Sequence, residues 1–164
     1  MANIVKHVSA FLLPITVLLI IPTFLQRELN MSGGLIPLLG ILLMLAGYML
    51  FTASVSMFSR LGEGTLAPWS PPRKLVTDGI YGQVRNPMIS GVLFVLLGES
   101  LVFESQAIFA WFLLFFVVNN VYFSVSEEPG LLKRFGDEYA AYKSNVPRWI
   151  PRGTPWHPTP QKPD

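Results

Sequence analysis

Three long stretches without a charged side chain constrain this chain more than any other feature of its sequence. Residues 7–26, 29–59 and 105–126 contain no Asp, Glu, Lys or Arg. About 20 apolar residues in a helix cross the hydrocarbon core of a bilayer, so each stretch is long enough to span it. A fourth uncharged stretch, 86–98, is shorter and can be extended only by including Glu99. The pattern predicts an all-helical integral membrane protein with about four transmembrane helices.

A soluble helical bundle fits the sequence poorly. Helices of a soluble bundle need polar outward faces, whereas residues 40–57 are apolar nearly all round. Only 13% of the residues are charged, about half of the usual content of a soluble domain. A cleaved signal peptide is not expected within residues 1–26, because the apolar stretch is too long and no small-x-small cleavage site follows it.

The residue content excludes several kinds of chemistry. The chain has no cysteine, which excludes disulfides and thiolate catalysis, and its two histidines, His7 and His157, lie near its ends. Gly62-Glu63-Gly64 lacks the third glycine and the preceding strand of a Rossmann fingerprint, and no Walker loop, GxSxG or HExxH occurs. The formal net charge of +2 is too small to indicate a nucleic-acid partner. No metal site is expected either.

The order of apolar and polar segments predicts three parts. Two transmembrane helices, at about 7–26 and from the 31–34 turn to Phe58, make up residues 1–59. Residues 60–151 contain a long loop rich in proline and glycine, a tight helical hairpin and a C-terminal amphipathic helix. The hairpin helices are expected at Met88–Phe103 and at 105–126, with Ser105 as a helix cap. Residues 152–164 are rich in proline and are expected to form a loose tail.

The amphipathic helix is predicted from apolar residues that recur every three or four positions. They are Leu132, Phe135, Tyr139, Tyr142 and Val146. Such a helix lies on the membrane surface or caps the bundle.

The basic residues indicate how the chain is oriented. Eleven of the twelve Lys and Arg residues fall in the N-terminus, the long loop or the C-terminal segment, and Arg27 is the exception. Four spans put those three segments on one side of the membrane, and the positive-inside rule makes that side cytoplasmic. Glu99 and Glu104 then lie on the opposite side, where we interpret them as a boundary of the span and not as a site.

Three polar features converge on the predicted cytoplasmic face. Arg85 stands where the third helix enters the membrane, and Glu127-Glu128 end the fourth helix, where the helix dipole disfavours carboxylates. A nearby cation such as Arg85, or a cationic ligand, would explain that pair. Asn120, Ser124 and Glu127 share one stripe of the fourth helix. The alternatives are a snorkelling arginine, a solvated helix end and interhelical hydrogen bonds.

The stretch from Gly62 to Pro151 resembles the membrane methyltransferases of the isoprenylcysteine carboxyl methyltransferase and phospholipid N-methyltransferase superfamily. Three blocks carry the resemblance, in the order and spacing of the family: GEGTLAPWSPPRKLV, DGIYGQVRNPMISG and SEEPGLLKRFGDEYAAYKSNVPRWIP. The resemblance implies S-adenosyl-L-methionine as cofactor, bound by the C-terminal half without a Rossmann domain. It also implies a lipid or amphiphilic acceptor, such as an isoprenylcysteine carboxylate or an amino-lipid.

The same resemblance implies the site residues. Those carried over for cofactor binding are Tyr81, Arg85, Asn86, Pro87, Gly91, Glu127, Glu128 and Tyr139, with Arg85 and Glu127 also as catalytic residues. Tyr142, Pro147 and Arg148 match the C-terminal block. The sequence departs from the family at Ile89, where Tyr is common, and at residues 80–83, where Pro-Tyr-Arg-Tyr is common.

Two alternatives stay open, and the second of them rests on these departures. One is an NADPH-dependent membrane reductase of the sterol reductase type, against which the Glu-Glu-Pro block counts. The other is a non-enzymatic membrane binding protein.

Overall fold

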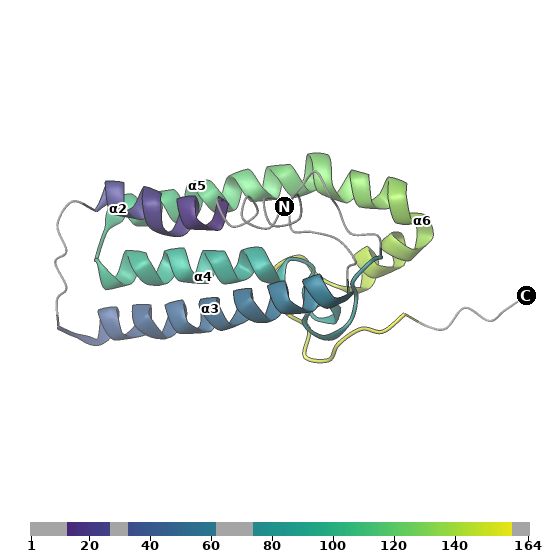
Figure 1. Cartoon of the computed structure of the whole chain (residues 1–164), viewed down its shortest axis with the longest axis horizontal. Coiled ribbons are helices and arrows are strands. Elements are labelled where there is room, and N and C mark those ends of the chain that lie inside the picture. Colours follow the sequence, from purple (N-terminus) through teal and green to yellow (C-terminus); the bar gives the residue numbers. More distant parts are fainter. Residues whose placement is uncertain (1–12, 27–32, 62–73, 159–164) are drawn as a thin grey trace, which may run out of the picture.

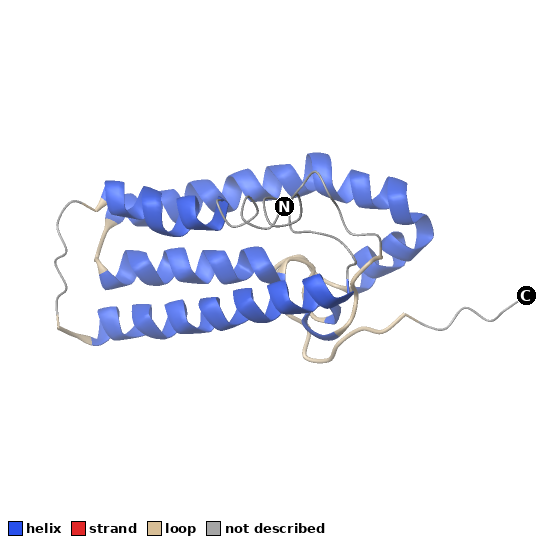
Figure 2. Ribbon diagram, viewed as in Figure 1, coloured by secondary structure: helices blue, strands red, loops and turns tan. Residues whose placement is uncertain are grey.

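The chain folds as a bundle of helices lying side by side. The computed structural model describes residues 13–26, 33–61 and 74–158, which contain helices, turns and loops and no strand (Figures 1 and 2). In chain order the elements are the π-helix η1 (Thr16–Ile20), α2 (Ile21–Leu25), α3 (Leu35–Leu61), the 3₁₀-helix η2 (Gly79–Gly82), α4 (Pro87–Val102), α5 (Gln106–Tyr122), the π-helix η3 (Phe123–Glu127) and α6 (Glu128–Asn145). All four helical segments expected from the uncharged stretches are present in the part of the chain that the structure describes, and residues 7–12 of the first lie outside it.

Two of these helices are long and apolar enough to cross a membrane. They are α3, with a mean hydropathy of 2.2, and the continuous run Gln106–Asn145, with a value of 1.9. Few residues in either apolar stretch are buried inside the protein, as expected for surfaces that face lipid. The apolar segments Leu13–Leu25 and Pro87–Val102 are shorter. Four membrane spans were expected, and two helices of the described chain have the length and composition of a span.

Helices α3 and α4 form the closest contact of the bundle. Gly40 and Gly47 of α3 face Gly98 and Gly91 of α4, so that the two backbones touch. A Cβ atom on Gly91 would lie 2.7 Å from the carbonyl oxygen of Gly47, closer than van der Waals contact allows. Small residues at such positions let two membrane helices gain dispersion energy along their length.

The opposite face of α4 packs against η1 and α5. Val92 and Leu96 are buried there against Val17 and the aromatic residues Trp111 and Phe115. The Trp111 indole donates a hydrogen bond to the Val17 carbonyl, 3.2 Å away. The hydroxyl of Ser105 accepts from the backbone N–H of Ile108, which confirms the predicted cap.

The C-terminal helix bends back over one end of the bundle, called the pocket end below. Gly136 has φ +53°, a left-handed conformation that glycine adopts without steric cost, and it interrupts α6. The second half of α6 therefore turns back toward η2 (Figure 1). Of the two positions expected for this helix, the structure has the one that caps the bundle.

The segment after α6 pairs through backbone groups with the loop 82–85. The Arg85 N–H donates to the Pro147 carbonyl, the Arg152 N–H to the Gln83 carbonyl and the Trp156 N–H to the Gly82 carbonyl. The Trp156 ring also packs against Tyr142. Residues 147–156 thus follow the loop 82–85, because backbone pairing and a tryptophan fix them there. The tail beyond residue 158 lies outside the described residues.

Candidate functional site

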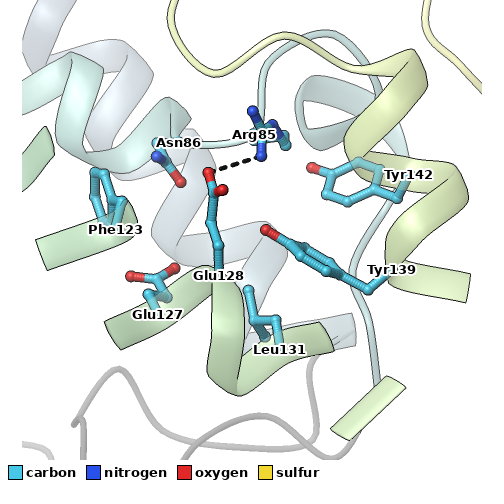
Figure 3. Close-up of a pocket in the computed structure, with 8 residues that line it drawn as sticks. All are labelled: Arg85, Asn86, Phe123, Glu127, Glu128, Leu131, Tyr139 and Tyr142. Carbon is cyan, nitrogen blue, oxygen red and sulfur yellow. Dashed lines mark hydrogen bonds and ion pairs between the residues drawn. The ribbon is translucent and has the colours of Figure 1, made fainter. Parts of the chain in front are cut away.

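A small pocket lies where the start of α4 meets η3 and α6, at the end of the bundle that α6 covers. Eight residues line it: Arg85, Asn86, Phe123, Glu127, Glu128, Leu131, Tyr139 and Tyr142 (Figure 3). Arg85 and Asn86 come from the turn that leads into α4, and the others come from η3 and α6. The cavity has a volume of about 30 Å³. That is room for about one water molecule.

Glu128 is the centre of the charge network in this pocket. Its Oε1 accepts from Arg85 Nη1 at 2.8 Å and from Arg148 Nε at 2.9 Å, and its Oε2 lies 2.8 Å from Lys143 Nζ. The carboxylate is only 8% exposed, against 13% for Arg85, 20% for Arg148 and 48% for Lys143. A buried carboxylate with several charge-assisted hydrogen bonds is held in one orientation. Two adjacent carboxylates at a helix end predicted a nearby cation, and Arg85 is that cation.

The two adjacent glutamates have different electrostatic environments. Burial alone would raise the pKa of Glu128, but hydrogen bonds from Lys143 and Arg148 and the charge of Arg85 outweigh it and lower the pKa. For Glu127, burial and the neighbouring charge of Glu128 raise the pKa, and Arg148 offsets this only in part. Both residues lie beyond the apolar part of α5. Glu128 is therefore a carboxylate whose two oxygens both have cationic partners. Glu127 also lines the pocket but ionises less readily.

Arg148 connects the C-terminal segment to the polar stripe of α5 and η3. Besides Glu128, its Nη1 donates to Ser124 Oγ at 3.0 Å and to Asn120 Oδ1 at 3.4 Å. The Trp149 indole also donates to Asn120 Oδ1, at 2.9 Å, and its ring packs on Phe116 and Phe123. The stripe seen in the sequence thus binds a side chain of the same protein.

Tyr81 has its contacts in the scaffold behind the pocket. It is buried, its hydroxyl donates to the Ser54 carbonyl of α3, and its own carbonyl accepts from the Tyr142 hydroxyl at 2.8 Å. Burial, followed by the charge of Glu127, raises the pKa of Tyr81. Because its hydroxyl is already paired, Tyr81 holds η2 between α3 and α6.

The structure brings together five of the eight residues expected from the resemblance. Arg85, Asn86, Glu127, Glu128 and Tyr139 all line the pocket (Figure 3).

The other three residues lie outside the lining. Tyr81 occupies the scaffold position just described. Pro87 is the buried first residue of α4, where its missing N–H costs no hydrogen bond. Gly91 packs against Gly47 and Phe51 of α3.

Two of the cations that pair with Glu128, Lys143 and Arg148, were not among the site residues expected from the sequence. Arg148 could have been proposed as a site residue, because it belongs to the C-terminal block of the resemblance. Nothing in the sequence, however, pairs it with Glu128, twenty residues earlier. Lys143 had no distinguishing signal, because it resembles any other charge on the polar face of an amphipathic helix. Both reach Glu128 only because the chain turns at Gly136. The first block of the resemblance falls largely on residues 62–73, outside the described residues.

One polar atom in the pocket region lacks a partner. The Nε of Arg85 is buried and has no hydrogen-bond partner among the described residues. A buried donor without an acceptor is destabilising, and a ligand with an acceptor group would remove that cost.

Comparisons with known proteins agree with the resemblance drawn from the three blocks. The sequence profile of the family described as "Phospholipid methyltransferase" matches residues 35–138, more than half of the chain. A protein of Schizosaccharomyces pombe named "Protein-S-isoprenylcysteine O-methyltransferase" is 40% identical over 80 residues. The match covers 47% of this chain and 33% of that relative, so the chain spans only part of the relative's length. On the extent of the profile match, this chain belongs to the phospholipid methyltransferase family.

Proposed function

We propose that this protein is an S-adenosyl-L-methionine-dependent methyltransferase acting on a membrane-embedded or amphiphilic acceptor. The observation that carries the proposal is the gathering of Arg85, Asn86, Glu127, Glu128 and Tyr139 at one small pocket, at the end of two apolar helices. Family membership and the name of the S. pombe relative support the same reaction. They also favour it over a nicotinamide-dependent reductase.

The chemistry of the lining residues fits this cofactor. S-adenosyl-L-methionine supplies an electrophilic methyl group on a sulfonium cation, and it carries a carboxylate, an amino group and ribose hydroxyls. The unpaired Nε of Arg85 is a donor for the carboxylate. Glu127 accepts from the amino group or the ribose. The faces of Tyr139 and Phe123 suit the adenine ring and the sulfonium.

The present cavity is too small for a ligand of this size. At about 30 Å³ it falls well below the roughly 300 Å³ at which small-molecule sites begin. Binding therefore requires the pocket to widen. The C-terminal segment is the element best suited to move, because Arg148 occupies polar groups of α5 and η3 that a ligand would otherwise contact.

The rate of methyl transfer depends mainly on how the acceptor and the cofactor are positioned. The acceptor attacks in line with the bond that breaks, so residues that fix both partners supply most of the rate. Arg85 and Glu127 hold the cofactor end, and the apolar surfaces of α3 and α5 accommodate the acyl or prenyl part of the acceptor. An acceptor carboxylate needs no base, whereas an amine has to lose a proton.

We also propose that the chain crosses the membrane four times, with both termini and the pocket on the cytoplasmic face. Leu13–Leu25 and Pro87–Val102 would be the two additional spans, aided by local thinning of the bilayer. Because the chain has no cysteine, Gly33→Cys and Gly153→Cys each introduce a single thiol at an uncrowded, exposed position. A membrane-impermeant maleimide should label only the cysteine at 153 from the cytoplasmic side. Labelling of both cysteines from that side would contradict the topology.

The cofactor proposal is tested by calorimetric titration of S-adenosyl-L-methionine and S-adenosylhomocysteine into detergent-purified protein. We expect saturable binding that weakens at least tenfold in Arg85→Ala and in Glu127→Ala, which is about 1.4 kcal/mol or more. Glu138→Ala is the matched control, because Glu138 is an exposed glutamate of α6 outside the pocket. Unchanged affinity in both pocket variants would refute the site. NADPH binding without S-adenosyl-L-methionine binding would favour the reductase, and binding of neither would favour a binding protein.

A further inference from the structure

Another ionisable group is buried at the end of the bundle opposite the pocket. Glu99 lies in α4 and is only 6% exposed. Its Oε2 is fully buried and has no hydrogen-bond partner among the described residues. A residue that only marks the boundary of a span does not need to be buried in this way, and the proposed methyl transfer does not use Glu99.

The described helices that pack against the face of α4 that carries Glu99 contribute no charged side chain. Glu99 follows Leu96 by three residues and Val92 by seven, which puts it on the face of α4 that packs against η1 and α5. Residues 13–25 and 106–126 contain no charged residue, and Arg60, the only one in α3, lies at the other end of that helix. In the described part of the chain, the nearest charge along the sequence is Glu104, in the link to α5. Arg27 and Glu28 lie outside the described residues.

A carboxylate is unfavourable in such a place. Moving an ionised carboxyl group out of water without a partner costs far more free energy than moving the neutral acid. Ionisable residues kept inside membrane helices are rare and usually have a role.

We propose that Glu99 is a proton-binding site within the bundle. It keeps its proton to a higher pH than a glutamate in water does, and its ionisation loosens the packing of α4 against η1 and α5. The stability that the neutral group contributes is fully present only at a pH below the pKa of a glutamate in the unfolded chain. It is lost as the pH rises far enough to remove the proton.

The direct test is a carbon-13 NMR titration of side-chain carboxyl groups in protein labelled at glutamate. Glu99→Gln assigns the Glu99 resonance, and Glu104→Gln provides the matched control. We expect Glu99 to keep the chemical shift of a protonated acid above the pH at which glutamate in a model peptide ionises. If Glu99→Gln fails to fold, Glu99→Asp assigns the same resonance, since aspartate carries no label. Titration of Glu99 together with Glu104 would overturn the proposal.

A stability measurement separates a proton site from an ion pair. Thermal unfolding in detergent should show that raising the pH lowers the Tm of the wild type, and that Glu99→Gln removes most of that decrease. The Arg27→Gln variant should leave the Glu99 titration unchanged. If it instead makes Glu99 easier to protonate, Glu99 is ionised and paired with Arg27, and the proposal fails.

Discussion

The contact between α3 and α4 and the charge network around Glu128 hold the bundle together in opposite ways. Along α3 and α4, paired glycines bring two backbones into contact without a charged group. At the pocket end, one buried carboxylate joins Arg85, Lys143 and Arg148 from three different segments. The first contact has no tolerance for added atoms. The second has a single indispensable centre and several partners that can partly replace one another.

The largest effect is expected from filling the glycine contact. In Gly91→Leu the added side chain meets the Gly47 carbonyl and the Phe51 N–H, where a Cβ alone would lie at 2.7 and 2.8 Å. Backbone atoms cannot rotate away, so α3 and α4 must separate and lose their packing. We expect no folded monomer on size-exclusion chromatography in detergent. Gly130→Ala is the control, since nothing lies within 4 Å of its added Cβ, and it should behave as wild type. A folded Gly91→Leu protein would disprove the close approach.

The second effect is expected from removing the centre of the charge network. Glu128→Gln keeps the shape of the side chain but leaves Arg85, Arg148 and Lys143 without their shared anion. Losing one partner of a buried pair costs about 3–5 kcal/mol. Because Lys143 is half exposed and Arg148 reaches solvent, we expect about 2 kcal/mol. Reversible unfolding in mixed detergent micelles measures this loss. A loss no greater than that of Glu138→Gln would mean that the cations find other partners.

The two regions also differ in how far the sequence predicts them. The Arg85–Glu128 pair was anticipated because two carboxylates at a helix end require a cation, and because both belong to family blocks. The glycine contact was not, because Gly40 and Gly47 lie in an apolar stretch whose period does not show which face meets a neighbour. Gly91 was assigned to the cofactor site on resemblance, and its contacts are those of helix packing. Local sequence therefore reveals charges that need a partner more readily than surfaces that need close approach.

The same limit explains the tail and Glu99. Proline-rich sequence predicts a loose tail from residue 152, and no local pattern shows that the N–H groups of Arg152 and Trp156 donate to carbonyls of the loop 82–85. Glu99 ends an uncharged stretch and so resembles a boundary. Its burial depends on η1 and α5 covering that face of α4, which is a property of the assembled bundle.

The smallest effect is expected at the periphery of the charge network, and it tests whether the partners of Glu128 are equivalent. Lys143 binds Glu128 Oε2 at 2.8 Å, but its side chain is 48% exposed, so solvent screens the pair and the flexible chain loses entropy when it forms. We expect Lys143→Ala to cost about 0.5 kcal/mol. Arg148→Ala should cost more, about 1–2 kcal/mol, because it also loses the hydrogen bonds to Ser124 and Asn120. The same unfolding assay compares the two variants. Equal losses would mean that charge alone holds the C-terminal segment over the pocket. A larger loss for Arg148 would mean that its directional hydrogen bonds fix the segment, which is then the element that has to move before a large ligand can enter.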